Sequence, residues 1–283
     1  MRFMAVGLVL AVLAGGALAG GLQKADVTAD AKWVAHADNE QFLASRIGQL
    51  VMTDLEALGV LDFSNGLSKM LGLPKLADLR SITLYGPDAD EKSAVALIKG
   101  VFDEAKATAA VTRADQHAEI PYEGLRIHQW FDRGDRKTKY GAFPEPGTLV
   151  IGQSEARVKL ALDVLAGRGQ SLAAGDSPIS AMPVTENAMW FSAAQDVAKL
   201  AAASHSAILR NAQTASVTMA EKEGSVVLDA GMVMSSTEAA AQVGQILEGW
   251  KSLALLGQAQ SPVLATVTRG VSFAVEDTAV GIH

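Results

Sequence analysis

The sequence predicts an α+β fold of two related halves, each a mostly antiparallel sheet covered on one face by helices. Three observations support this. Short segments of alternating character are bounded by turn residues, amphipathic helical segments follow them, and the same order restarts after a linker at residues 169–187. The chain has 283 residues and no Cys, so a packed core rather than disulfides must stabilise it.

The chain begins with the pattern of a secretory signal peptide. Arg2 precedes the uncharged apolar run 3–13, and small residues lead to Ala17-Leu18-Ala19. We expect residues 1–19 to be the signal peptide, with cleavage between Ala19 and Gly20. The apolar run is shorter than a bilayer span, although an uncleaved N-terminal anchor stays an alternative. The prediction is an exported protein, periplasmic or extracellular, with no membrane span in the mature chain.

The first half is expected over residues 20–168. Alternating apolar and polar residues, or short apolar runs, indicate strands at Trp33–Ala37, Ser81–Tyr85, Gly124–Phe131, Lys137–Phe143 and Thr148–Ile151. Apolar residues at helical spacing indicate helices after Asn39, at Ser64–Leu71, at Glu91–Ala107 and after Ser154. Asn39 and Ser154 are expected N-caps, Gly167 ends the last of these helices, and 132–135 forms a hairpin turn.

The second half is expected over residues 188–283. Its predicted strands are Trp190–Ala194, Ser216–Ala220, Val226–Met234, Val263–Thr268 and Val271–Glu276. Its predicted helices are Asp196–Ala212 and Thr237–Leu256.

Three local similarities relate the halves. Trp33–Ala37 matches Trp190–Ala194, and Ser81-Ile82-Thr83 matches Ser216-Val217-Thr218. The third set has equal spacing in the two halves: Val95, Ile98 and Phe102 against Val243, Ile246 and Trp250. Each half would then bury one face of its sheet under helices, and the halves would pair edge to edge.

Composition excludes several classes of function. The formal net charge is −7 and no basic stripe with interleaved aromatics occurs, which argues against nucleic acid as a partner. Without Cys there is no thiolate nucleophile, Cys-bound zinc or iron–sulfur cluster. No phosphate-binding glycine loop and no helical His pair is found, so we expect no cofactor and no metal.

The first half resembles a group of secreted bacterial proteins. The resemblance rests on Tyr140–Phe143, Leu149–Gly152, Ser154-Glu155 and Ala161–Gly167, and it extends back to Thr83–Gly86. The group has no assigned activity. The resemblance therefore implies secretion and an α+β repeat but no site residues.

The best candidate for a binding surface lies on the predicted strands around residues 126–140. Arg126, His128, Trp130, Lys139 and Tyr140, with Lys137, offer aromatic area and cations, which suit a protein, glycan or small-molecule partner. The same side chains would instead be structural if they pack under a helix.

The predicted function is a non-enzymatic binding or structural role in the envelope. The alternative is a secreted hydrolase without a motif, using Ser154 or an acid pair with His128 or His36.

Overall fold

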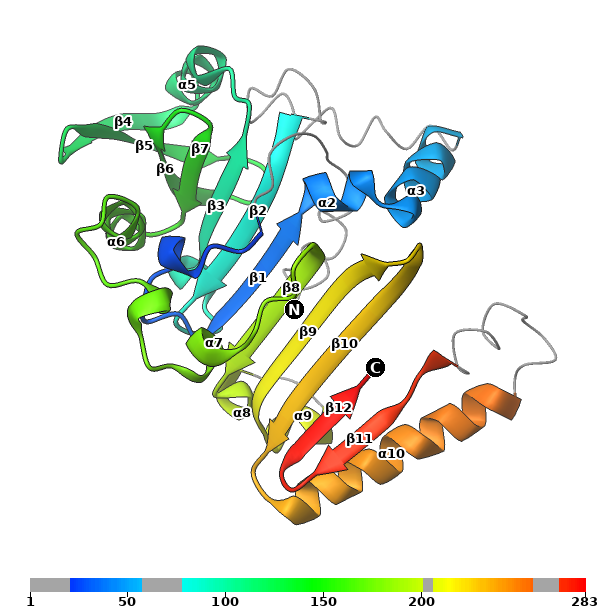
Figure 1. The fold of residues 1–283 in the computed structure, drawn as a ribbon. Coiled ribbons are helices and arrows are strands. Elements are labelled where there is room, and N and C mark those ends of the chain that lie inside the picture. Colours follow the sequence, from blue (N-terminus) through cyan, green and yellow to red (C-terminus); the bar gives the residue numbers. More distant parts are fainter. Residues whose placement is uncertain (1–20, 58–77, 201–205, 257–269) are drawn as a thin grey trace.

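The protein is described by a computed structural model that covers residues 21–57, 78–200, 206–256 and 270–283. It is an α+β structure with one 12-stranded sheet in the order β11-β12-β10-β9-β8-β1-β2-β3-β7-β6-β5-β4 (Figure 1). Every neighbouring pair of strands in this sheet is antiparallel. Strand β1 of the predicted first half is hydrogen-bonded to strand β8 of the predicted second half, with Trp33 opposite Ala194.

The strands have the following bounds: β1 Trp33–Asp38, β2 Leu79–Gly86, β3 Val95–Gly100, β4 Asp115–Tyr122, β5 Leu125–Asp132, β6 Lys137–Glu145, β7 Thr148–Gly152, β8 Ala188–Gln195, β9 Ala212–Lys222, β10 Ser225–Met234, β11 Phe273–Glu276 and β12 Ala279–Ile282. The helices are η1 Lys24–Asp26, α2 Asn39–Ala44, α3 Arg46–Ala57, η3 Glu91–Ser93, α5 Glu104–Thr112, α6 Glu155–Leu165, η4 Leu172–Ala174, α7 Pro178–Ala181, α8 Val197–Leu200, α9 Ala207–Arg210 and α10 Thr237–Leu256.

The main core lies between the sheet and α6. Val158 and Leu162 of α6 are fully buried against sheet residues such as Val150 and Ile127. We call this side of β4–β7 the α6 face. The opposite side carries α5 and is called the α5 face, so helices flank these strands on both sides (Figure 1). A second core forms where α10 packs on β10, β11 and β12.

The predicted helix at Glu91–Ala107 is wrong. Residues 95–100 form β3, which pairs with β2 and β7, and α5 begins only at Glu104, where the Asp103 carboxylate accepts a hydrogen bond from the Lys106 amide. Val95 and Leu97 are buried at period two, and pairing on both sides outweighs the helical spacing. The spacing shared by Val95–Phe102 and Val243–Trp250 therefore compares a strand with a helix.

Smaller differences follow from local chemistry. The first cap is Asp38 rather than Asn39, because the Asp38 carboxylate accepts from the Gln41 amide at 3.0 Å. The helix predicted at Asp196–Ala212 is present as the short α8 and α9, and Ala212 already belongs to β9. Strands β4 and β12 were not predicted, and the linker carries η4 and α7. The predictions at Ser64–Leu71 and Val263–Thr268 lie outside the described residues.

Candidate functional site

A β-bulge at the edge of the sheet lies beside the candidate site. The register of β4 on β5 shifts between Asp115 and Ala118, and Gln116 has a φ of 54°. Beyond the bulge, Glu119 lies directly opposite His128. His117 stands two residues before Glu119 on β4, so both side chains face the same side of the sheet as His128.

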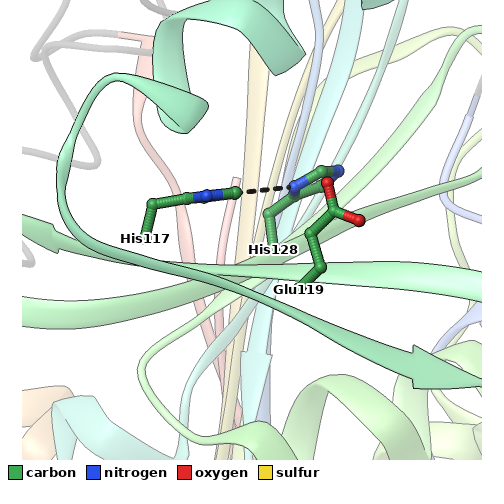
Figure 2. Close-up of side chains that lie close together, drawn as sticks. All are labelled: His117, Glu119 and His128. Carbon is green, nitrogen blue, oxygen red and sulfur yellow. Dashed lines mark hydrogen bonds between the residues drawn. The ribbon is translucent and has the colours of Figure 1, made fainter.

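Three side chains from this hairpin converge on the α5 face. His117 Nε2 and His128 Nδ1 are 3.2 Å apart, and Glu119 lies beside them, with one potential ligand atom from each residue within 4.8 Å of the others (Figure 2). The two imidazole planes differ by 24°. We call these three residues the His–Glu cluster.

The environment of His128 favours a neutral imidazole. Only 8% of the residue is exposed. Burial lowers the pKa of His128, and Arg126 and His117 lower it further, whereas the Glu119 carboxylate acts in the opposite direction. A neutral ring keeps one nitrogen lone pair, so His128 can act as an acceptor or as a ligand.

A hollow of about 480 Å³ adjoins this cluster between α5 and strands β5–β7. Its lining residues are Ala107, Ala110, Val111, Arg113, Ala114, Asp115, His128, Trp130, Phe131, Asp132, Arg133, Lys139, Gly141, Phe143, Leu149 and Ile151. The volume falls within the range of small-molecule pockets, which is about 300–1,000 Å³.

The hollow exists because small residues face each other across it. The helix α5 contributes Ala107 and Ala110, Ala114 follows the end of this helix, and strand β6 contributes Gly141. None of these four residues has a side chain long enough to fill the space between them. The Trp130 ring covers Gly141 instead, within 3.2 Å of where a Cβ atom would stand.

Four of the five charged residues that line the hollow are in ion pairs, and the fifth, Arg113, is exposed. Lys139 Nζ lies 2.6 Å from Asp132 and 2.9 Å from Asp135, and Arg133 donates to both carboxylate oxygens of Asp115. Burial alone would raise the pKa of Asp132, but the hydrogen bond and charge of Lys139, together with backbone hydrogen bonds from Gly134 and Asp135, outweigh burial and lower that pKa. The lining that remains for a ligand is therefore mostly apolar and aromatic, with His128 and Arg113 as polar contacts.

The structure separates the five residues that the sequence proposed for binding. Trp130 lies opposite Lys139 in the register. Arg126, His128 and Trp130 occupy every second position of β5, so these three residues share the α5 face. Arg126 is exposed and contacts Glu119 at 3.6 Å. Tyr140 lies opposite Gln129 and packs against the main core on the α6 face. Grouping Tyr140 with the others on one surface was therefore incorrect, because adjacent strand residues point to opposite faces.

Sequence reasoning missed His117 and Glu119 because no strand was predicted at residues 115–122, which form β4. A usable signal was present: His117-Ala118-Glu119 has strand alternation, and the Glu123-Gly124 turn folds this segment onto residues 125–132. Both turn residues have positive φ, at 48° and 82°.

Of the residues of the hydrolase alternative, His128 belongs to the His–Glu cluster, whereas Ser154 and His36 lie elsewhere. Ser154 Oγ accepts from the Arg157 amide at 3.4 Å and serves as the N-cap of α6. His36 is buried on β1, where its Nδ1 lies 2.9 Å from Thr83 Oγ1. Lys137, the remaining cation of the predicted surface, pairs with Glu91.

The comparisons with known proteins establish the fold and no family. No family model matches the chain, and no curated protein matches it. Crystal form III of TP0453 is similar in structure, with a TM-score of 0.53, 12% sequence identity, and coverage of 95% of this chain and 94% of that one. Two further crystal forms of TP0453 give TM-scores of 0.48 and 0.49. Within the described ranges, no helix has the length and apolar character needed to cross a membrane.

Proposed function

We propose that this chain is an exported, non-enzymatic binding protein that holds a small, largely apolar molecule between α5 and strands β5–β7. The observation that carries the proposal is the hollow of about 480 Å³, with Trp130 and Phe143 in its wall and with four of its five charged lining residues in ion pairs. Burial of apolar ligand surface against such walls supplies affinity, and a few polar groups orient the ligand. His128 is the polar group placed to do this.

Export is supported by the leader pattern of residues 1–19 and by the resemblance to secreted bacterial proteins. We place the mature protein in the periplasm or outside the cell. Sequencing the N-terminus of protein recovered from the exported fraction tests this. Gly20 as the first residue is expected, and an intact Met1 in a membrane fraction would contradict it.

We also propose that the two halves arose from one repeated unit. The order of strands in the sheet supports this, because it is the same on both sides of the central β1–β8 pair. It runs β1-β2-β3 on one side and β8-β9-β10 on the other. In each half a helix follows the third strand, and the last strand returns to pair with that third strand, β7 on β3 and β12 on β10. The hairpin of β4 and β5 would then be an addition to the first unit.

The hydrolase alternative receives less support from the geometry. A nucleophilic serine needs a base within hydrogen-bond reach, whereas the contact of Ser154 is the backbone amide of its own helix. We therefore favour binding over hydrolysis.

A pocket-filling variant tests the proposed binding. The probe is an anionic anilinonaphthalene dye, whose fluorescence rises in apolar surroundings. Ala110 and Ala109 are both exposed residues of α5, but only Ala110 lines the hollow. Ala110→Phe should weaken dye binding about tenfold or more, because the ring occupies the space of the ligand. Ala109→Phe, the matched control, should bind as the unaltered protein does. Equal dye binding by both variants would contradict the proposal.

A further inference from the structure

The His–Glu cluster has the composition of a divalent-cation site. Two imidazole nitrogens and one carboxylate are a ligand set that Zn²⁺ accepts, and catalytic zinc sites often combine three protein ligands with one water. His117 and Glu119 come from β4 and His128 from the opposite position on β5. Two adjacent strands hydrogen-bonded in register hold these three groups together without help from a distant segment.

The distances fit this ligand set. Zn²⁺ binds imidazole nitrogen at about 2.0–2.1 Å, so two nitrogens of one tetrahedral site lie about 3.3 Å apart. His117 Nε2 and His128 Nδ1 are 3.2 Å apart. The Glu119 ligand atom lies within 4.8 Å of both, and its exposed side chain has the freedom to close the remaining gap.

A hydrogen bond between the two rings also gives this nitrogen separation, and it is the arrangement that Figure 2 draws. That bond requires a proton on one of the two facing nitrogens. To bind a cation, that ring must carry its proton on the other nitrogen, and both rings must turn so that their lone pairs converge. His117 is half-buried, so its ring has more room to turn than that of the buried His128, which serves as the fixed ligand.

We propose that His117, Glu119 and His128 form a binding site for a divalent cation of the zinc class, with a solvent molecule as the fourth ligand. This site adjoins the apolar hollow, and the two share His128. The Arg126 guanidinium, 3.6 Å from Glu119, competes for the carboxylate and limits the affinity.

The test is a Zn²⁺ titration of chelator-treated protein against a chromophoric competitor, with residues 20–283 as the protein. We expect saturable binding of one ion per chain. His117→Ala and Glu119→Gln should each weaken it about tenfold or more. The matched controls are Glu123→Gln, which removes the same charge from the same hairpin, and His283→Ala, which removes a histidine remote from the cluster. Both controls should bind Zn²⁺ as the unaltered protein does.

Co²⁺ provides a second readout that does not depend on affinity. Bound by this ligand set, Co²⁺ should show the intense visible absorption of tetrahedral coordination, and the band should be lost in His117→Ala. Absence of saturable Zn²⁺ binding, or unaltered affinity in either His117→Ala or Glu119→Gln, would overturn the proposal. Neither result would affect dye binding in the hollow, so the two proposals fail separately.

Discussion

Substitution of Leu162 by Ala tests the packing that supports the site from the α6 face. Leu162 is fully buried, with 0% of its surface exposed, in the core shared by α6 and the sheet. The neighbouring Val158, Val150 and Ile127 are also fully buried. Because a sheet paired on both sides cannot collapse into the space left behind, the loss includes both the transfer free energy and a cavity term. We expect Leu162→Ala to lower the free energy of unfolding by about 3–4 kcal/mol, within the range of about 2–5 kcal/mol for such changes.

The same helix offers the control for this measurement. Leu160 has 36% of its surface exposed, so Leu160→Ala should lower the free energy of unfolding by about 1 kcal/mol or less. Urea unfolding followed by far-ultraviolet circular dichroism measures both variants, with equal slopes indicating that only stability has changed. Similar losses for Leu160→Ala and Leu162→Ala would refute the assignment of α6 to this core.

Two further predictions concern titration and helix capping. The pKa of Asp132 is lowered in the folded protein, so the Lys139–Asp132 pair stabilises the fold above the ordinary Asp value of 3.8. This stabilisation should disappear as the pH falls below that value, and unfolding measured at successive pH values should show a weaker acid dependence for Asp132→Asn than for the unaltered protein. Ser154→Ala removes the oxygen that accepts from the Arg157 amide, and it should lower the free energy of unfolding by about 1 kcal/mol while dye binding is unchanged. An unaltered stability of Ser154→Ala would contradict the capping role.

The elements that could be predicted from sequence are those whose local signals agree with their tertiary surroundings. The helix predicted at Thr237–Leu256 is α10, with the same bounds. Ala240, Val243 and Leu247 are buried against the sheet, whereas Ile246, Trp250 and Leu253 are exposed. The Ser154 cap is confirmed by its hydrogen bond to the Arg157 amide. Both features depend on neighbours within a few residues, and such information is complete in the sequence.

The errors occur where distant pairing decides the structure. Residues 95–100 have apolar positions compatible with either period, and only the presence of β2 and β7 on its two sides makes this segment a strand. The placement of Tyr140 fails for a related reason. Its neighbour Lys139 was put on the same surface, although consecutive residues of a strand must face opposite sides of the sheet.

The His–Glu cluster was missed because no strand was predicted at residues 115–122, although its two β4 members need only regular alternation. His117 and Glu119 are two residues apart and therefore face one side of the sheet. The register shift between Asp115 and Ala118 serves another purpose: it makes the edge strand β4 irregular, and an irregular, charged edge resists pairing with another chain. We therefore infer that the bulge protects the edge, so deletion of Gln116, which restores regular pairing, should increase aggregation, as measured by light scattering. Unaltered light scattering would contradict this role of the bulge.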